Sequence, residues 1–297
     1  MLNHLKAIGE NPKRVVVLGA NGFIGGAICK KLTSLAVEVL ALGRLELDLL
    51  KAGAGKQLAG FLSAGDVLVF ASARAPCKNL EMLIDNIQMA KSVCEALKIK
   101  ELEQVIYISS DAVYTDTDGL ISETSCAEPE SIHGIMHLTR EVALKHEYFG
   151  PLAIVRPTLV YGLNDPHNGY GPNRFRRLAS SSEDIILFGE GEERRDHVDV
   201  EDIAELVSRI IFRKSTGVIN AVSGDVVSFR ELADFIVSDF NSVASVKGSF
   251  RSGLMPHNGY RAFDTKAISE AFPGFRFKTW KQGISRVNYS YKEQFNK

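Results

Sequence analysis

The chain has 297 residues, 45% of them hydrophobic, which is long enough to bury a large core in one or two domains. Its 35 Lys and Arg residues nearly cancel its 36 Asp and Glu residues, leaving a formal net charge of -1, and this balance gives no indication of nucleic acid or an anionic membrane as a partner. The polar start, residues 1–14, predicts neither a signal peptide nor a membrane-spanning helix.

Strand-like and helix-like segments alternate along the first half. Residues 14–18 contain an unbroken apolar run, as in a strand buried on both faces, and residues 23–35 have helical periodicity. The same patterns predict strands over residues 37–42, 66–71, 104–109 and 153–157 and helices over residues 80–97 and 133–148. Continuous apolar strands separated by helices are typical of a parallel sheet covered on both faces, so we predict a doubly wound α/β fold.

The second half is less regular. Pro and Gly residues within 163–177 predict a loop, and such loops commonly form substrate sites. A capping box, Ser228 with Glu231, predicts a helix that ends near residue 240. The patterns also predict strands over residues 198–200 and 218–222 and helices over residues 202–212 and 265–271. Three phenylalanines are expected to pack in a core: Phe272, Phe275 and Phe277.

The four cysteines lie far apart in the sequence: Cys29, Cys77, Cys94 and Cys126. A zinc site or a redox pair would place them at short, regular spacings such as Cys-x-x-Cys. We therefore expect no metal site and a reduced, cytoplasmic protein.

Three glycines separate the first predicted strand from the first predicted helix. They stand in Gly19-Ala20-Asn21-Gly22-Phe23-Ile24-Gly25. Gly19 allows a sharp turn, Gly22 allows the backbone to approach a pyrophosphate, and Gly25 allows the helix to pack close to the sheet. The helix N-terminus adds unpaired N–H groups and a positive dipole end. Because the glycines follow a strand and open a helix, they predict a dinucleotide site rather than a simple turn.

The end of the second strand indicates which dinucleotide is preferred. Gly43-Arg44 stands where an NAD-preferring site usually has a carboxylate for the ribose hydroxyls. A guanidinium can instead pair with a 2′-phosphate, so Arg44 favours NADP over NAD, the alternative being a solvated loop residue. Asp48 and Leu49 follow, and Asp48 could accept the adenine amino group or cap the next helix.

These motifs together resemble the extended short-chain dehydrogenase/reductase family of NAD(P)-dependent nucleotide-sugar epimerases, dehydratases and reductases. Besides the glycine turn, the resemblance rests on residues 109–114 (SSDAVY), 156–162 (RPTLVYG) and 195–202 (RDHVDVED). Residues 44–50 are most similar to the NADP-using reductases of deoxysugar synthesis. The family implies a Rossmann domain over residues 1–162, with some later segments returning to it, and a smaller substrate lobe formed mainly by residues 163–297.

The resemblance also implies roles for single residues. Ser110 matches the catalytic Ser or Thr, whose hydroxyl bonds the substrate oxygen, while Asp111 matches an acid of the dehydratases or is a turn residue. Asn86 matches an Asn that supports the loop beside the cofactor. Further cofactor contacts are implied at Ala71, Ser72, Ala73, Ser109, Pro157 and Thr158. Substrate contacts are implied at Tyr114, Asn173, Arg174 and Arg195, the last against a diphosphate.

The positive charge of residues 174–177 has a second explanation. Arg174, Arg176 and Arg177 would form a surface salt-bridge cluster with Glu192 and Glu193 equally well. A surface salt-bridge cluster explains less well why Arg195 matches the family's Arg-Asp motif.

The helix predicted over residues 133–148 departs from the family. Where the family has Tyr-x-x-x-Lys, with the Tyr moving a proton and the Lys holding the nicotinamide ribose, this chain has His133 and His137. Residues four apart share a helix face, so both imidazoles can face the cofactor cleft. An imidazole with an ordinary pKa of about 6.5 can act as acid or base at neutral pH. We expect Ser110 and His133 to handle the hydroxyl proton, and His137 to be a poorer substitute for the Lys.

Three alternatives stay open for this pair. It could belong to a catalytically inactive NADP-binding sensor or regulatory subunit, since a fold does not guarantee its family's chemistry. The spacing also suits a metal, although no third ligand is identifiable and the cofactor should fill that space. Asp111, Tyr114 or Tyr170 could replace the missing Tyr as proton donor.

We expect an enzyme that reduces, epimerises or dehydrates a nucleotide-diphosphate sugar by hydride transfer with NADP. Its activity should depend on a group that titrates near neutral pH, namely His133. Family members often dimerise through two helices, so we also expect a homodimer formed by residues 80–97 and 133–148.

Overall fold

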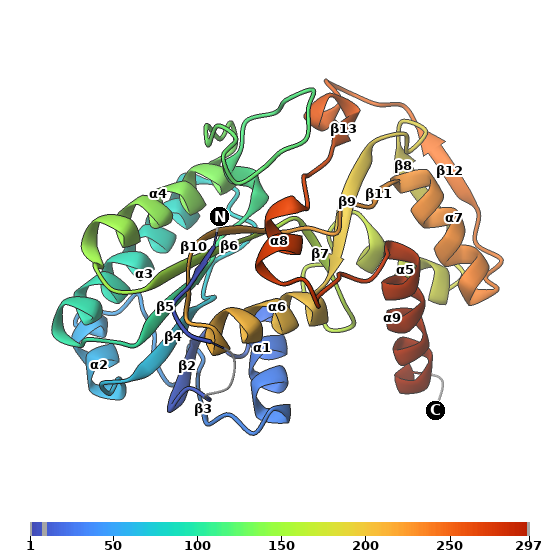
Figure 1. Ribbon diagram of the computed structural model, residues 1–297. Helices are drawn as coiled ribbons and strands as arrows, with labels where there is room; N and C mark the ends of the chain where they lie inside the picture. The colour runs from blue at the N-terminus through green and yellow to red at the C-terminus, as the bar shows by residue number, and fades with distance from the viewer. Residues whose placement is uncertain (1, 8–10, 296–297) are drawn as a thin grey trace.

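The computed structural model describes residues 2–7 and 11–295, and its centre is a seven-stranded sheet (Figure 1). The strand order is β1 (Asn3–His4), β10 (Ser215–Ala221), β6 (Leu152–Pro157), β5 (Gln104–Ile108), β4 (Asp66–Phe70), β2 (Arg14–Leu18) and β3 (Val39–Leu42). All neighbours are parallel except β1, which pairs antiparallel with β10. After β2 the chain adds β3 on one side and β4 on the other. Ligands of such sheets bind outside the carboxyl ends of the strands at this switch point.

Helices cover both faces of the sheet. On one face lie α1 (Phe23–Ser34), α6 (Val200–Phe212) and α8 (Lys266–Ala271). On the other lie α2 (Ala54–Phe61), α3 (Leu80–Ile99) and α4 (Ile132–Glu147). Alternate strand residues supply the two cores, as β2 shows: Val15 and Val17 belong to the first core, and Val16 and Leu18 to the second.

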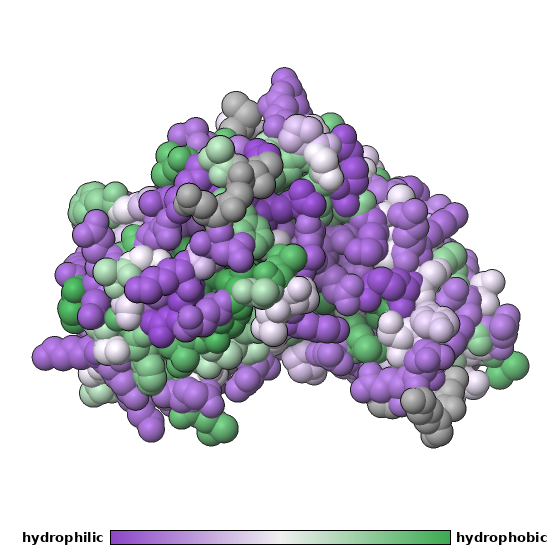
Figure 2. All heavy atoms as spheres, turned by 60° about the horizontal axis from the view of Figure 1, so that its bottom comes forward, coloured by the Kyte–Doolittle hydropathy of each residue, from purple (hydrophilic) through white to green (hydrophobic). Residues whose placement is uncertain are grey.

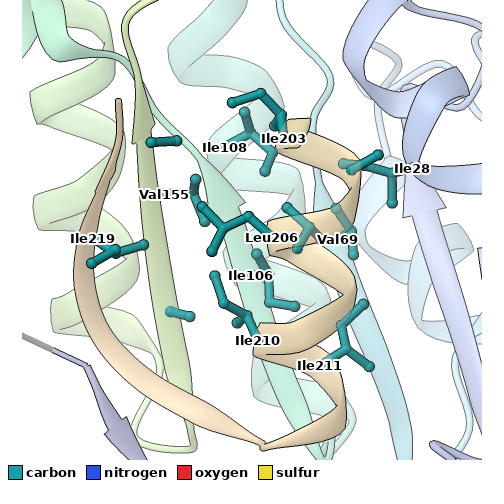
Figure 3. Close-up of a cluster of buried hydrophobic side chains, with 14 of the residues drawn as sticks. Ile28, Val69, Ile106, Ile108, Val155, Ile203, Leu206, Ile210, Ile211 and Ile219 are labelled. Carbon is teal, nitrogen blue, oxygen red and sulfur yellow. The ribbon is translucent and has the colours of Figure 1, made fainter. Parts of the chain in front are cut away.

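The first core explains why residues 200–212 form a helix. Four buried side chains recur at helical spacing: Ile203, Leu206, Ile210 and Ile211. They lie over side chains of β4, β5 and β6 (Figure 3). Asp199 caps the helix by accepting a hydrogen bond from the Glu201 amide at 3.0 Å. The packed helix keeps the sheet in place beneath the site.

A second, smaller lobe has its own core. One of its sheets combines β7 (Leu159–Tyr161), β9 (Arg194–Asp199), β11 (Val226–Ser228) and β13 (Tyr260–Arg261), and the other pairs β8 (Ile185–Phe188) with β12 (Val246–Ser249). Its helices are α5 (Pro172–Ser180), α7 (Phe229–Phe240) and α9 (Trp280–Phe295). Buried side chains of these elements form one apolar cluster that includes Phe175, Phe229 and Trp280. In Figure 1 this lobe lies to the right of the large sheet. Across the described ranges, no helix is long and apolar enough to cross a membrane.

The structure corrects several expected elements. The expected loop over residues 163–177 contains the start of α5, and Val200 begins α6 instead of ending a strand. From the second half of the chain, β10, α6 and α8 pack with the large sheet. Phe272 and Phe275 are buried as expected, but in the core of the large sheet and not in the second lobe. The sequence patterns missed α2 and α9 altogether.

Candidate active site

The turn between β2 and α1 needs glycine, because a Cβ at Gly19 or Gly25 would collide with neighbouring backbone atoms. Gly19 has a φ of +84°, and a Cβ there would lie 2.9 Å from the Cα of Ser72. A Cβ at Gly25 would lie 2.1 Å from the carbonyl oxygen of Gly19, so glycine lets α1 start against the turn. Gly22 is the N-cap of α1 and offers no side chain to the first amides, and the first turn carries no acidic residue. The N-terminal amides of α1 therefore remain available to an anion, as a dinucleotide pyrophosphate requires.

A cavity of about 290 Å³ lies beside this turn, at the carboxyl ends of β2, β3 and β4. The structure brings many of the predicted cofactor residues together around it: Gly19, Asn21, Gly22, Arg44, Asp48, Leu49, Ala71, Ser72 and Ala73. Phe23 and Ile24 follow in the first turn of α1. The residues present therefore fit the adenosine and pyrophosphate portion of a dinucleotide.

The rim of this cavity carries an exposed guanidinium. The Arg44 side chain is 78% exposed, and its Nε lies 3.4 Å from the Asp48 carboxylate. Asp48 also accepts a hydrogen bond from the Leu50 amide at 3.1 Å, as a turn residue does. The nearby Glu46 accepts the Gly43 amide at 2.8 Å and does not line the cavity. The positive charge is thus more open to a ligand than the carboxylates are.

The loop after β4 forms one wall of the cavity and is held from behind by two buried side chains. Asn86 accepts a hydrogen bond from the Arg74 amide and donates to the Arg74 carbonyl, both at 3.0 Å. Arg140 donates to the carbonyl oxygens of Ser72 at 2.8 Å and of Asn86 at 2.9 Å. The position of this wall therefore depends on α3 and α4.

Ser110, Asp111 and His133 are brought together because α4 begins against a short 3-10 helix, η1 (Asp111–Val113). A Cβ at Gly134 would lie 2.0 Å from the Ala112 carbonyl oxygen, so a glycine is needed for this approach. The Asp111 carboxylate is near enough to favour a positive charge on His133. The candidate catalytic residues therefore share one small region.

The two histidines share one face of α4, with ring centroids 4.7 Å apart and planes at 87°. The Cys77 amide donates to Nδ1 of His133 at 3.3 Å, and Nδ1 of His137 lies 2.7 Å from the Tyr107 hydroxyl. Burial lowers the pKa of His133 from 6.5, helped by the Arg140 charge, and lowers the pKa of His137 further still. Both imidazoles are therefore neutral at neutral pH. This shift runs against the expectation that His133 titrates near neutrality, because burial outweighs the opposing charge of Asp111.

A buried ionic cluster adjoins Ser110. Asp111 accepts a hydrogen bond from Nε of Arg261 at 3.0 Å and lies 3.9 Å from Arg195, which also pairs with Glu193 at 3.2 Å. Arg195 is 8% exposed, and its Nε has no hydrogen-bond partner among the residues that the structure describes. The cluster therefore keeps one unsatisfied guanidinium N–H, which an anionic group could accept.

Two tyrosines considered for the site are held in cores. Tyr114 is 3% exposed, donates its hydroxyl hydrogen to Asn220 at 2.7 Å, and has the Arg156 guanidinium over its ring. Tyr170 accepts a hydrogen bond from the Phe188 amide at 3.1 Å and packs among phenylalanine rings of the second lobe. The predicted substrate contact of Tyr114 is therefore wrong, because its hydroxyl is already satisfied inside the protein.

Other predicted contact residues also have their side chains engaged. Asn173 is buried, and its side-chain oxygen accepts the Gly162 amide at 3.1 Å, so its predicted contact with substrate would use its NH2 group. Ser109 donates to Glu141 at 2.6 Å, and Thr158 donates to a backbone carbonyl at 3.2 Å. The hydroxyl hydrogens of Ser109 and Thr158 are therefore committed inside the protein, and Pro157 is buried beside them in the chain.

The arginines of the expected loop lie on α5. Arg176 is fully buried and donates to the carbonyl oxygens of Gly162 and Leu163 at 3.2 and 3.3 Å. Arg177 donates to Asn168 at 2.9 Å, and Arg174 is exposed. The glutamates at 192 and 193 pair with other arginines. The surface salt-bridge explanation is therefore wrong for Arg176 and Arg177, whose guanidinium groups hold the helix to the preceding loop.

A larger cavity, of about 830 Å³, runs along α1 between the two lobes, where the surface in Figure 2 is hollowed. It shares Asn21 and Gly22 with the smaller cavity. Most of its charged lining is already paired, as in the contact of Lys31 with Glu205 at 2.5 Å. Neither Ser110 nor either histidine of α4 lines it. These residues do not line the smaller cavity either, but its wall at Ser72 is bonded to Arg140 of α4, so we assign the candidate active site to the smaller cavity and the adjoining part of α4.

Metal and thiol chemistry find little support in the described ranges. No three His, Cys, Asp or Glu side chains gather there as metal ligands. The four cysteines are free thiols, and burial raises the pKa of Cys94 to about 11. Such a thiol stays protonated at neutral pH and is a poor nucleophile.

The sequence patterns missed four side chains around the site: Tyr107, Arg140, Glu141 and Arg261. Helical spacing could have found Arg140, which lies three residues after His137 on the same face. Alternation along β5 could have found Tyr107, which faces the same layer as α4. No local signal links Arg261 to Asp111, because 150 residues separate them.

Comparison with known proteins agrees with this geometry. The NAD dependent epimerase/dehydratase family matches residues 15–227. An uncharacterized UDP-glucose epimerase of Bacillus subtilis is 28% identical over 42% of this chain and 40% of that protein. The dTDP-4-dehydro-6-deoxy-D-allose reductase of Streptomyces bikiniensis is 26% identical over 76% of this chain and 81% of that protein.

The fold has close counterparts among solved structures. UDP-glucose 4-epimerase of Thermotoga maritima, solved with UDP-glucose, matches with a TM-score of 0.85 and 18% identity, over 96% of this chain and 100% of that one. This likeness shows a Rossmann-type α/β fold. Since the family match extends over most of the sequence and includes the glycine turn, the chain belongs to the NAD dependent epimerase/dehydratase family.

Proposed function

We propose that the chain is an NADP-preferring oxidoreductase that reduces, epimerises or dehydrates a nucleotide-diphosphate sugar. The observation that carries this proposal is that α4, which carries His133, packs against the short helix that follows Ser110, and that α4 also bonds the loop lining a cavity fitted to a dinucleotide. Family membership supports the substrate class, as do the names of the epimerase and reductase relatives. A bound nicotinamide dinucleotide supplies hydride transfer, and the residues of this chain bind, orient and handle protons.

His133 acts as a neutral hydrogen-bond donor in this proposal. Its Nδ1 accepts the Cys77 amide, so the single proton of the neutral ring lies on Nε2. An Nε2–H group can stabilise negative charge that develops on the substrate oxygen, as a preorganised donor does. Its lowered pKa keeps this form present at neutral pH.

In this proposal, Ser110 and His133 both hydrogen-bond the reacting oxygen of the substrate. Ser110 also relays the proton of that oxygen. Its Oγ lies 3.4 Å from an oxygen of Asp111, whose other oxygen is bound by Arg261. Arg261 thus pairs with one oxygen of Asp111, and the other oxygen is the one near Ser110. An ionised Asp111 can accept a proton from Ser110, which suits removal of hydrogen from a sugar hydroxyl.

Arg195 binds the diphosphate in this proposal. Its buried guanidinium has an unsatisfied Nε–H, and its planar fork suits phosphate oxygens. Arg44 favours NADP because its exposed charge can pair with a 2′-phosphate at the cavity rim.

A homodimer and a cytoplasmic location are part of the proposal. Five large apolar side chains of α3 and α4 are exposed: Leu80, Ile84, Ile99, Ile135 and Val142. A second copy packing on these helices would bury them. The free cysteines suit a reducing compartment. Light scattering of Ile84→Glu tests the dimer, because a charge in that interface should yield monomers while Ile186→Glu, on exposed β8, should not.

Titration calorimetry tests the function. We expect the protein to bind NADPH more tightly than NADH and to select one of a panel of nucleoside diphosphates. Arg195→Met should weaken nucleoside diphosphate binding by about 10- to 100-fold, from the loss of charge-assisted hydrogen bonds. Arg194→Met is the matched control, since that neighbour pairs with Glu231 at the surface. Binding of no dinucleotide would overturn the proposal.

Turnover separates an enzyme from an inactive sensor. A panel of nucleotide sugars is incubated with the protein and NADP or NADPH, and products are followed by mass spectrometry. His133→Ala should abolish conversion while leaving NADPH binding largely intact, because His133 does not line the dinucleotide cavity. Unchanged turnover in His133→Ala would remove His133 from the mechanism. Dinucleotide binding without conversion of any sugar would favour the sensor.

A further inference from the structure

A full positive charge lies buried behind the two histidines. The Arg140 side chain is completely buried and donates to Asn86 and Ser72, while its guanidinium lies 4.8 Å from the centre of the Phe70 ring. None of these partners is a carboxylate, and the described part of the chain gives Arg140 no ion pair. Such an uncompensated charge is costly to bury, so its neighbours are expected to turn electron-rich atoms toward it.

Tyr107 is the neighbour that connects this charge to His137. The ring of Tyr107 is fully buried next to Phe70, with centroids 5.4 Å apart. Burial raises the pKa of Tyr107, and the charge of Arg140 opposes that shift. That nearby charge favours the hydroxyl orientation in which the oxygen lone pairs, and not the hydrogen, face it. Among the hydrogen bonds of the described residues, the one acceptor for this hydroxyl is Nδ1 of His137 at 2.7 Å, so the hydroxyl hydrogen points there.

This contact decides which ring nitrogen of His137 carries the proton. The pKa of His137 is lowered well below 6.5, first by burial and then by the charges of His133 and Arg140. A neutral ring that accepts a hydrogen bond at Nδ1 must carry its hydrogen on Nε2. Within the described residues, no hydrogen bond engages that Nε2 atom. His137 therefore has one uncommitted N–H group on the helix face that it shares with His133.

We infer that Tyr107 and Arg140 are positioning residues that hold His137 as the Nε2–H tautomer, which presents an uncharged N–H donor to the ribose hydroxyls of the dinucleotide. The inference rests on the proposed function, since it assumes that a dinucleotide binds on this face. It gives His137 a specific role, because the chain thereby supplies a hydrogen-bond donor without adding a second cation beside Arg140.

The first test reads the tautomer directly and needs no cofactor. Two-bond ¹H–¹⁵N spectra of the full-length ¹⁵N-labelled protein are recorded at pH 7, with the His137 signals assigned by their loss in His137→Gln. We expect a neutral ring protonated at Nε2. Tyr107→Phe should convert it to a mixture of tautomers. Tyr148→Phe is the matched control, because Tyr148 lies in the same core and its hydroxyl donates to the Leu102 carbonyl at 3.3 Å. An Nδ1–H ring or a charged ring in the unmodified protein would overturn the inference.

The second test asks whether the donor is used. NADPH affinity is measured by calorimetry for His137→Gln, which keeps an N–H donor, and for His137→Leu, which removes it. We expect Gln to stay within about threefold of the original affinity and Leu to lose about tenfold, the worth of one hydrogen bond. Equal losses in both variants would mean that His137 only fills space, and would overturn the inference.

Tyr107→Phe should weaken NADPH binding by severalfold, whereas Tyr148→Phe should leave it unchanged. The two tests also separate failure of the inference from failure of the proposed function. If the unmodified protein binds neither NADPH nor NADH, the proposed function fails together with the donor role. If NADPH binds but His137 carries its proton on Nδ1, the proposed function stands and the inference alone fails.

Discussion

The glycine turn and the inner face of α4 adjoin the same site, yet they contribute to it in different ways. The turn works through backbone N–H groups and missing Cβ atoms, and a Cβ at Gly25 would collide with backbone at 2.1 Å. The face of α4 works through the side chains of His133, His137 and Arg140. A geometric requirement on the backbone has one solution, whereas a hydrogen-bond donor can be built from several side chains.

The attachment of α4 to the sheet should produce the largest effect. Glu141 is fully buried and receives Arg156 at 2.6 and 2.9 Å. Glu141→Gln leaves the Arg156 charge buried without a counter-charge, which should cost about 3–5 kcal/mol of unfolding free energy in urea denaturation. Glu147→Gln on the same helix removes an exposed pair with Lys98 and should leave the midpoint unchanged. Equal midpoints for the two variants would show that the buried pair of Glu141 and Arg156 does not attach α4 to the sheet.

The turn should respond next. Gly25→Ala forces backbone apart and should cost about 1–3 kcal/mol of stability, with loss of NADPH binding. The control is Gly60→Ala in α2, where no atom lies within 4 Å of the added methyl group. That change should instead stabilise the protein by up to about 1 kcal/mol, because alanine favours a helix. Thermal unfolding and calorimetry check both, and normal NADPH binding in Gly25→Ala would break the contrast with α4.

The pH dependence of kcat/KM should reveal the state of His133. Its pKa is lowered from 6.5, so the neutral ring prevails at and above pH 6.5, and the fall in rate should come below that pH. As the pH falls below the lowered pKa, the neutral fraction drops about tenfold per unit, equivalent to about 1.4 kcal/mol. The rate should follow, because a proton on Nδ1 displaces the Cys77 amide. His146→Gln, an exposed change on α4, should not alter the profile. An inflection near pH 7 that disappears in His133→Gln would contradict this assignment.

Arg44 should give the smallest effect. Its side chain is 78% exposed, so Arg44→Ala should weaken NADPH binding by about 1 kcal/mol, or roughly fivefold, and leave NADH unaffected. Lys56→Ala, an exposed cation on α2, serves as the control for a general loss of positive charge. An equal loss for NADPH and NADH would mean that Arg44 does not read the 2′-phosphate.

Local sequence patterns were enough to predict the strands that are buried along their whole length. The strands β2, β4 and β5 are covered on both faces, so their apolar runs were unambiguous. The short helix α2 opens with Gly53 at a φ of +78° and lacks a side-chain cap, and the mixed pattern of α9 gives no strong signal either. These helices are stabilised by tertiary packing more than by local preference.

The candidate site divides in the same way. Gly19 to Gly25 form one continuous segment, so spacing alone predicted the turn. Tyr114 bonds Asn220, which lies far along the chain, and Asn173 lies on α5 where the sequence predicted a loop. No local sequence pattern predicts either hydrogen bond. The lowered pKa of His133 likewise depends on how deeply α4 is covered, which spacing does not reveal.

The position of β10 has a consequence for folding while the chain is being synthesised. This strand comes from residues 215–221 yet lies beside β6, with five residue pairs in register. During synthesis, the edge of β6 stays uncovered until residues 158–221 have also been made, because β6 ends at Pro157 and β10 ends at Ala221. An open strand edge is a template for pairing with other chains. A nascent chain stalled near residue 162 should therefore be a client of chaperones, and that segment expressed alone should aggregate.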